Sequence, residues 1–233
     1  MLVIAARVRA VARNVSTSKE LVEAGLRVLR EHGAAELTLR RVAEAAGAST
    51  MGIYTGFGGR TGLLEAIYLR GFESLRDALE PHAGSTAENT TGSTAGGSDG
   101  TPDGAPDGAP VERIRAVALA YRRFALADPE LYALMFERPI PDFDPSPDLR
   151  RRALGMTFGL LTDATRDAVR ARLISAADPV RAAYLVWTAI HGMVGIELTH
   201  SLRSPLPGWF LDGPEAGEKV LADGVDALLR GLR

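Results

Sequence analysis

The 233-residue chain contains no cysteine and no long uninterrupted apolar run. Without cysteine there is no disulfide, no cysteine-bound zinc, no iron–sulfur cluster and no thiol nucleophile. No apolar stretch approaches the roughly 18 residues that a membrane span requires. The opening Leu-Val-Ile-Ala-Ala is interrupted by Arg7 and Arg9 before it could form the core of a signal peptide. We therefore expect a globular protein of the cytoplasm, with no membrane contact.

Catalytic sequence motifs are also missing. The chain has no glycine-rich phosphate loop, no nucleophile elbow and no HExxH metal motif. The best candidate for an enzyme site is a metal or acid–base cluster of His191, Glu197 and His200. His191 and His200 lie about 13 to 14 Å apart along a helix that rises 1.5 Å per residue, too far to bind one ion without another segment. We therefore expect no enzyme and no cofactor.

Charge is distributed unevenly along the chain. Residues 1–60 carry nine Lys and Arg against five Asp and Glu, and residues 61–233 carry 18 against 24. The two parts have net charges of +4 and −6, which sum to −2. A basic end on an acidic body is typical of a protein that turns one face toward phosphates, although a solvated surface without a partner would show the same split.

A 27-residue tract from Gly84 to Pro110 has seven Gly, five Thr, three Ser and three Pro, and ends in the repeat PDGAPDGAP. It contains no Leu, Ile, Val, Met or aromatic residue and so cannot bury a core, which predicts a disordered acidic linker. The predicted organisation is an N-terminal domain at 1–80, the linker at 84–110 and a second domain at 111–233.

On both sides of this tract apolar residues recur at helical spacing and no stretch alternates with a period of two, which predicts an all-α protein. Thr17 and Glu20 form a capping-box pair at the start of a first helix that ends near Gly33. Thr38 and Ser49 are the expected N-caps of the second and third helices. Further helices are expected at about 60–79, 111–127, 130–137, 149–173, 179–202 and 214–232.

The stretch LTLRRVAEAAGASTMGIYTGFGGRTGLLEAI, residues 37–67, contains two short helical patterns joined through Gly47. A helix, a short turn containing Gly and a second helix opened by hydroxyl residues is the layout that presents the second helix to DNA bases. Ser49 and Thr50 can reach phosphates or bases, and Met51 can touch a thymine methyl group. The stretch therefore predicts a helix-turn-helix whose recognition helix enters the major groove.

Residues 17–79 resemble the DNA-binding motif of the tetracycline-repressor-like (TetR) family of bacterial regulators. The family pattern is met by Thr38, Val42, Ala43, Ala46 to Ser49, Ile53, Tyr54 and Phe57. Two positions depart from it, because Gly56 stands where the family often has His and Arg60 replaces a common Lys.

The resemblance implies two kinds of DNA contact. The residues expected to hold phosphates are Thr38, Tyr54 and Arg60, and the expected base readers are Ser49, Thr50, Met51 and Thr55. Arg40, in the first turn of the second helix, faces either phosphate or solvent. Arg7, Arg9 and Arg13 form either an arm along DNA or, as the simpler interpretation, an extended or disordered terminus. The apolar residues Val42, Ile53, Phe57 and Leu64 are expected in the core that holds the recognition helix.

In the C-terminal half, the sequence WTAIHG at Trp187 to Gly192 resembles the C-terminal domain of one TetR branch, which is named for its Trp, His and Gly. In that branch this helix helps to surround a ligand cavity, and the last two long helices pair with those of a second subunit. Trp187 and His191 lie four residues apart on one helix face, where an imidazole can orient a ligand and an indole can cover it. Packing in the core or in a dimer interface would explain the same two residues.

Large and partly flexible apolar side chains accompany this pair and suit a pocket as well as an ordinary core. The expected ligand-binding residues are Tyr121, Phe124, Met135, Phe136, Met156, Phe158, Trp187 and His191. The predicted function is a regulator, most simply a repressor, that binds palindromic operator DNA as a homodimer. The two subunits are expected to pair through residues 179–202 and 214–232. A small, largely apolar ligand would release it. The alternative is a helical protein-binding adaptor, which would need no hydroxyl-rich recognition helix.

Overall fold

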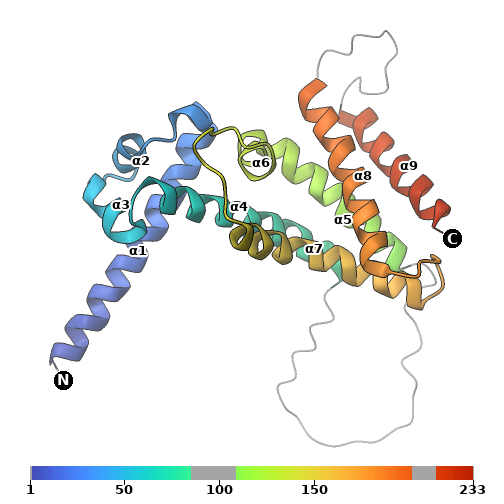
Figure 1. The fold of residues 1–233 in the computed structure, drawn as a ribbon, viewed down its shortest axis with the longest axis horizontal. Helices are drawn as coiled ribbons and strands as arrows, with labels where there is room; N and C mark the ends of the chain where they lie inside the picture. The colour runs from blue at the N-terminus through green and yellow to red at the C-terminus, as the bar shows by residue number, and fades with distance from the viewer. Residues whose placement is uncertain (1, 85–108, 201–213, 233) are drawn as a thin grey trace, which may run out of the picture. The chain divides into compact units, whose positions relative to one another are not determined.

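The structure, a computed structural model, describes residues 2–84, 109–200 and 214–232. Every regular element in these ranges is a helix (Figure 1), which confirms the predicted all-α fold. The helices are α1 (Leu2–His32), the 3-10 helix η1 (Ala34–Glu36), α2 (Leu39–Ala45), α3 (Thr50–Phe57), α4 (Arg60–Ala83), α5 (Ala109–Ala127), α6 (Pro129–Phe136), α7 (Pro147–Arg170), α8 (Pro179–His200) and α9 (Pro214–Gly231). None of the helices in the described ranges combines the length and apolar character needed to cross a bilayer.

Proline marks the start of α6, α7, α8 and α9, at Pro129, Pro147, Pro179 and Pro214. Proline suits the first helical turn because its fixed φ is compatible with a helix and its missing N–H would have no partner there. The predicted helices at 111–127, 130–137 and 149–173 coincide with α5, α6 and α7 to within three residues at each end. Residues 85–108 of the predicted linker, and the predicted end of α8 at 201–202, lie outside the described residues.

The predicted start of the first helix is wrong. Helix α1 begins at Leu2, so Thr17 and Glu20 lie inside a continuous helix and cannot act as its capping box. Arg7, Arg9 and Arg13 belong to the same helix, which corrects the expectation of an extended or disordered terminus. The physical reason is composition, because residues 2–16 include four Ala and three Arg and contain neither Pro nor Gly.

Contacts divide the chain into two compact units. Unit 1 consists of Met1–Arg76 and Phe124–Met156, and unit 2 consists of Asp77–Arg123 and Thr157–Arg233. Residues 124–156 therefore cluster with the N-terminal helices rather than with α8 and α9. The predicted division at residues 84–110 stays a prediction.

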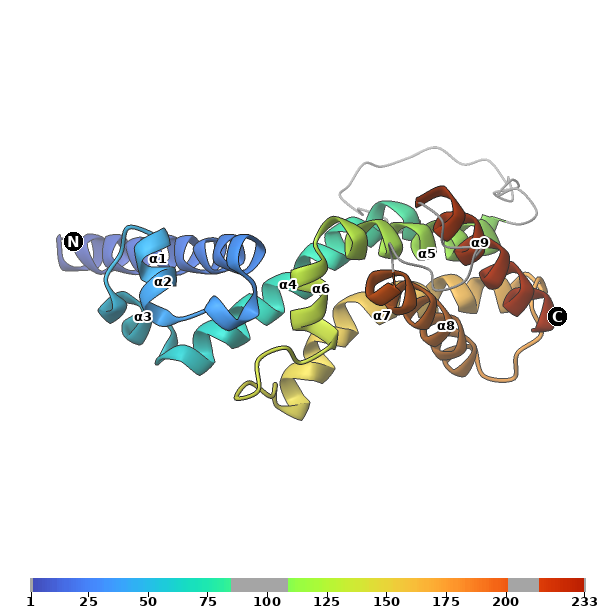
Figure 2. The same ribbon diagram turned by 90° about the horizontal axis from the view of Figure 1, so that it is seen from above.

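In unit 1, α2 and α3 lie against α1 and against each other (Figures 1 and 2). The residues at the centre are almost completely buried, and they are Leu21, Leu29, Val42, Ile53, Leu64 and Ile67. Gly25 permits the close contact of α1 with α4, because a Cβ atom there would lie 2.4 Å from Cδ1 of Ile67. Val42, Ile53 and Leu64 are thus core residues as predicted, whereas Phe57 is only half-buried.

Helix α6 packs on α1 and α4 within unit 1. Arg30 donates to a carboxylate oxygen of Asp128 at 2.6 Å, and the rings of Phe72 and Phe136 meet edge to face with centroids 5.4 Å apart. Gly71 makes room for α6, because a Cβ atom at Gly71 would lie 2.9 Å from Sδ of Met135. The helix that follows α5 is therefore in direct contact with α4.

Unit 2 is held together by α5, α8, α9 and the second half of α7, with α8 and α9 side by side (Figures 1 and 2). Its apolar core contains Ile114, Val117, Ala168, Val186, Ile190, Val194 and Val225. A buried ion pair lies beside this core, where Arg122 of α5 donates to Glu197 of α8 at 2.6 and 2.8 Å. Gly217 of α9 covers the carboxylate closely, because a Cβ atom there would lie 2.2 Å from Oε1 of Glu197.

Candidate nucleic-acid interface

Helices α2 and α3 are joined by a tight turn that is built around Gly47. Gly47 has φ +61°, in the left-handed region that glycine adopts without strain. Thr38 is the N-cap of α2, as predicted, and its hydroxyl oxygen accepts from the backbone N–H of Arg41 at 3.3 Å. Ser49 is the N-cap of α3 by backbone conformation, but its side chain makes no capping hydrogen bond. Its hydroxyl is therefore not used to cap the helix.

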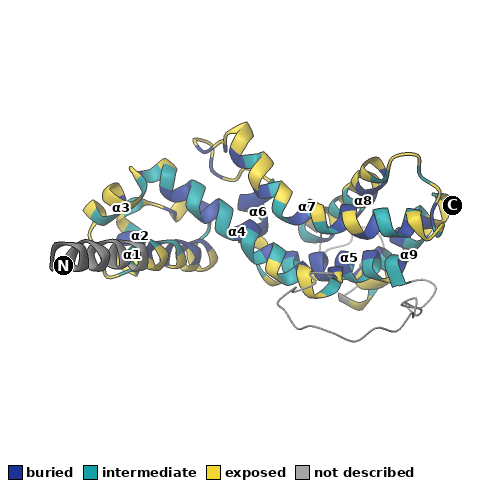
Figure 3. Cartoon of the chain, turned by 90° about the horizontal axis from the view of Figure 1, so that it is seen from below, coloured by how far each residue is buried: buried dark blue, intermediate teal, exposed yellow. Residues whose placement is uncertain are grey.

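Helix α3 is attached to unit 1 through a single fully buried residue, Ile53. The opposite side is open, as the yellow and teal α3 in Figure 3 shows. The exposed fraction reaches 69% for Met51 and 56% for Tyr54, and Thr50 is exposed as well. The helix contains no charged residue. It therefore presents hydroxyl, thioether and phenol groups to solvent.

Thr55 and Tyr54 were also predicted to contact DNA, and their side chains differ in the contacts that they already make within the protein. The hydroxyl of Thr55 donates to the carbonyl of Met51 at 2.9 Å, so only its lone pairs and methyl group remain for a partner. The ring of Tyr54 lies beside the turn after α3, 3.5 Å from where a Cβ atom of Gly59 would be. Gly58 and Gly59 have φ values of +73° and +127°, and this two-residue turn allows α4 to begin at Arg60.

Two of the predicted DNA-contacting residues are arginines on the helices before and after α3. Arg40 is exposed and Arg60, at the start of α4, is half-buried, and neither forms an ion pair with a residue in the described ranges. Arg41 differs, because it pairs with Glu36 at 3.1 Å. The eight predicted DNA-contacting residues thus all lie in unit 1, on α2, on α3 with its N-cap, and at the start of α4.

Four of the predicted ligand-binding residues meet in unit 2. The Tyr121 hydroxyl and Nδ1 of His191 are 2.7 Å apart, at hydrogen-bonding distance. The rings of Trp187 and His191 stack with centroids 5.3 Å apart, and Phe158 meets Trp187 edge to face at 6.4 Å. Burial lowers the pKa of His191 below its usual value. We call Tyr121, Phe158, Trp187 and His191 the aromatic cluster.

The other four predicted ligand residues, Phe124, Met135, Phe136 and Met156, belong to unit 1. Met135 is buried and packs on α4 together with Phe136. Tyr184 was not predicted, although its ring lies 5.8 Å from that of Trp187 and is more than half exposed. Its position three residues before Trp187 on one helix was the available signal. Glu197, considered above for an enzyme site, is instead bound by Arg122.

Comparison with known proteins identifies the family. Residues 21–67 match the family of bacterial regulatory proteins named after tetR, and residues 114–212 match the tetracyclin repressor-like C-terminal domain. The chain belongs to the TetR family. The first match contains α2, the turn and α3, so these elements belong to the DNA-binding domain of a TetR-family transcriptional regulator. Because the family consists of regulators, the prediction that the chain is not an enzyme is also confirmed.

Individual proteins are also similar to this chain. An HTH-type transcriptional regulator of Mycobacterium tuberculosis is 26% identical over 161 residues, which are 69% of this chain and 61% of that protein. The chain thus spans about three fifths of the curated relative. A Rhodococcus protein of unknown function has the same fold at TM-score 0.67 and 25% identity, covering 93% of this chain and 95% of its own. The TetR regulator PfmR of Thermus thermophilus gives TM-score 0.56 at 20% identity, covering 91% and 98%.

Proposed function

We propose that the protein is a cytoplasmic repressor that binds a near-palindromic operator as a homodimer, and that a small, largely apolar ligand in unit 2 releases it. The observation that carries the DNA-binding part is the exposed, uncharged side of α3 held in place by buried Ile53. A helix is about 10–12 Å in diameter with its side chains, so α3 fits a major groove about 12 Å wide. A protein-binding adaptor is less favoured, because it would not require a hydroxyl-rich, uncharged helix that follows one arginine, Arg40 on α2, and precedes another, Arg60 at the start of α4.

The side chains around α3 suit different parts of the duplex. Arg40, Arg60 and the Tyr54 hydroxyl are proposed to hold phosphates, which position the protein without reading sequence. Thr50 and Met51, at the start of α3, are proposed to touch base edges, together with Ser49 and Thr55.

Variants test this division of roles by binding selection on random duplexes. Tyr54→Phe and Arg60→Ala are expected to weaken binding to all sequences alike, and Arg60→Ala should reduce the slope of log K against log salt by about 1. Thr50→Ala and Met51→Ala should instead change the preferred bases by about 1–3 kcal/mol at one position. Arg152→Ala is the matched control, because it removes an exposed charge on α7 that is not in the proposed interface. Altered base preference in the first pair, with none in the second, would mean that α3 is rotated.

Dimerisation is proposed through α8 and α9. Helix α8 leaves four large apolar side chains 40–54% exposed, and they are Val180, Tyr184, Leu185 and Ile196. On α9, Val225 is buried within unit 2, whereas Val220 and Leu228 on this helix and Leu232 just after it stay partly accessible. A pair of helices from each subunit would cover these side chains in a four-helix bundle.

Sedimentation measures this assembly directly. The wild type should have twice the 24.8 kDa mass of the chain, and Ile196→Asp or Leu228→Asp should give monomers. Ala127→Asp adds the same charge to an exposed position on α5 and should leave the dimer intact. If both α8 and α9 variants remain dimeric, the interface lies elsewhere.

The proposed ligand site is the aromatic cluster, in line with the resemblance to the Trp-His-Gly branch. His191 with a lowered pKa favours the neutral imidazole, which suits an uncharged ligand. The coupling route is supported by connectivity: Tyr121 lies on α5, α6 follows it, and α6 contacts Gly71 and Phe72 of α4. Helix α4 joins α3 through Gly58 and Gly59, so a shift of α6 would reach the recognition helix.

A ligand releases DNA only by its difference in affinity for the two forms of the protein. A coupling of about 3 kcal/mol would lower operator affinity about 150-fold. The test measures operator affinity with a panel of uncharged aromatic and aliphatic compounds, for the wild type and for Trp187→Ala. Compounds that bind without changing operator affinity, or that act equally on Trp187→Ala, would overturn this part of the proposal.

A further inference from the structure

An arginine of α5 holds the carboxyl end of α4. The last carbonyl groups of a helix have no partner within the helix, and a cation beside them is favourable. Nη1 of Arg113 donates to the carbonyl oxygens of Ala83 at 3.5 Å and of Gly84 at 3.4 Å. Its Nη2 donates to Oδ2 of Asp167, on α7, at 2.7 Å. We call Arg113, Asp167 and these two carbonyl groups the α4 clamp, which joins three helices within unit 2.

The backbone at Gly84 is closely fitted to this arginine. Gly84 has φ +59°, the left-handed conformation that commonly follows the end of a helix. A Cβ atom at Gly84 would lie 2.7 Å from Cδ of Arg113, so a larger residue would displace the arginine side chain. The clamp is therefore a packed junction and not only an ion pair between exposed side chains.

The hydrogen bonds of the clamp are incomplete, which makes a second arrangement accessible. Nε of Arg113 is buried and has no hydrogen-bond partner among the residues that the structure describes. A buried donor without a partner raises the free energy of the arrangement that contains it. Asp167 also has a second arginine beside it, because Nη1 of Arg170 lies 3.4 Å from its Oδ1. Asp167 can therefore exchange Arg113 for Arg170 without losing an ionic partner.

The clamp lies on the same two helices as part of the aromatic cluster. Arg113 precedes Tyr121 by eight residues on α5, and Asp167 follows Phe158 by nine residues on α7. At 1.5 Å per residue these separations are about 12 and 13.5 Å. Because a helix is a rigid element, a ligand that shifts α5 against α7 at the aromatic cluster also shifts Arg113 against Asp167. Lengthening their 2.7 Å contact by about 1 Å ends the hydrogen bond.

We propose that Arg113 is the residue through which the ligand site in unit 2 controls α4. In the form that binds DNA, Arg113 holds Asp167 and the end of α4. In the ligand-bound form, Asp167 pairs with Arg170 and the end of α4 is released. This inference rests on the ligand site proposed above, and it adds the contact that connects this site with α4.

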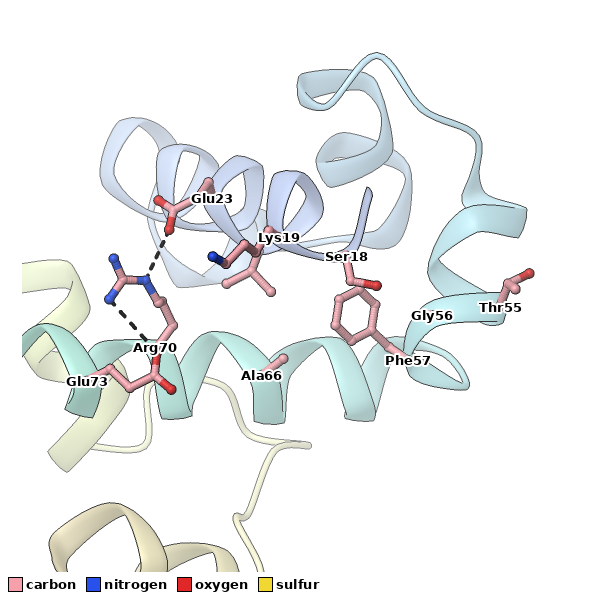
Figure 4. A pocket seen from close by; sticks show the side chains of 10 residues that line it. Ser18, Lys19, Glu23, Thr55, Gly56, Phe57, Ala66, Arg70 and Glu73 are labelled. Carbon is pink, nitrogen blue, oxygen red and sulfur yellow. Dashed lines mark hydrogen bonds and ion pairs between the residues drawn. The ribbon is translucent and has the colours of Figure 1, made fainter. Parts of the chain in front are cut away.

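Helix α4 carries the change to the DNA-binding helices because it belongs to both units. Residues 60–76 are part of unit 1 and residues 77–83 are part of unit 2. Within unit 1, Arg70 of α4 donates to Glu23 of α1 at 3.1 Å (Figure 4). The turn at Gly58 and Gly59 connects α4 directly with α3. A displacement of the carboxyl end of α4 therefore reaches both α1 and α3.

Variants of the full-length chain test the clamp on a duplex obtained by binding selection. Arg113→Met opens the clamp and should weaken binding to this duplex by about 5- to 150-fold, the usual range of allosteric coupling. Asp167→Asn keeps Arg113 in place but removes the ion pair, so it should change the affinity in the same direction. The matched control is Arg166→Met, which breaks an exposed pair with Asp163 on the same helix and should leave the affinity unchanged.

The response to a ligand is measured with N-phenyl-1-naphthylamine, an uncharged apolar fluorophore. At saturation it should weaken duplex binding by the wild type, and the factor should fall toward one in Arg113→Met, where the clamp is already open. Arg170→Met should also reduce this factor, because Asp167 has lost its second partner. Arg113→Met should bind the fluorophore more tightly than the wild type, since the linkage is reciprocal. A residue that only stabilises the fold would change none of these factors.

Hydrogen exchange tests the clamp without any ligand or operator. Backbone amides in the last two turns of α4 should exchange faster in Arg113→Met than in the wild type, at equal helix content by circular dichroism. If the fluorophore does not release the wild type from DNA, or acts equally on Trp187→Ala, the proposed ligand site fails, and exchange and DNA affinity in Arg113→Met still decide whether the clamp holds α4. Unchanged exchange in Arg113→Met, or equal release of the wild type and Arg170→Met by the fluorophore, overturns the proposed role of Arg113.

Discussion

Breaking the buried ion pair between Arg122 and Glu197 should destabilise the protein more than the loss of any surface ion pair. The two side chains are only 4% and 10% exposed, and two hydrogen bonds join them. Arg122→Met would leave the Glu197 carboxylate buried beneath Gly217 with its main partner gone. Removing one partner of such a pair costs about 3–5 kcal/mol. At about 2–4 °C per kcal/mol for a chain of this length, Tm should fall by roughly 6–20 °C.

The double variant Arg122→Met with Glu197→Leu tests the cause. It removes both charges, so it should recover most of the lost stability, because an apolar replacement of a buried pair is often neutral. The control is Arg151→Met, which breaks an exposed pair with Asp148 and should cost about 0–1 kcal/mol. Urea unfolding is followed by circular dichroism at one fixed protein concentration, since dimerisation would make stability depend on concentration. A double variant as unstable as Arg122→Met would show that lost packing, not the unpaired carboxylate, is responsible.

Three further predictions concern single residues. Gly62→Ala should destabilise unit 1 and weaken DNA binding, because the Cβ atom of the alanine would lie 2.0 Å from the Phe57 carbonyl oxygen. Gly155 on α7 has open space around it, so the control Gly155→Ala should stabilise the protein by about 0.5–1 kcal/mol in thermal unfolding. Ile53→Ala should lower the free energy of unfolding by about 2–5 kcal/mol in urea; a loss below 1 kcal/mol would contradict its role as the anchor of α3. His191 has a lowered pKa when folded, so the unfolded chain takes up a proton first as the pH falls, and stability should be full above the ordinary pKa of 6.5 and decline below it; His191→Asn should lose that part of the pH dependence.

The sequence was most informative where local physical chemistry decides the structure. Thr38 caps α2, Gly47 takes the left-handed conformation and Ile53 is buried, all because spacing along one short stretch determines them. The start of α1 was missed because Thr17 has the residue type of a cap, but nothing before it breaks the helix. A Ser or Thr acts as an N-cap only where the chain before it is not already helical.

Long-range packing could not be predicted in the same way. Arg122 and Glu197 are 75 positions apart, and no periodicity connects an arginine on one helix with a glutamate on another. The predicted ligand residues were grouped by their apolar character alone. That character does not distinguish Met135, which packs on Gly71 in unit 1, from Trp187, which stacks on His191 in unit 2.

The packing of α6 on α4 limits how the DNA-binding head can be used as a separate part. Cutting the chain near residue 80 would keep α1 to α4 but remove Met135 and Phe136, leaving Phe72 and the face around Gly71 uncovered. It would also leave Arg30 without Asp128. A chimera that transplants this head onto another sensor must therefore carry residues 124–156, or redesign the surface that they cover. The DNA-binding part that can be exchanged between proteins therefore consists of two segments that are not contiguous in the sequence.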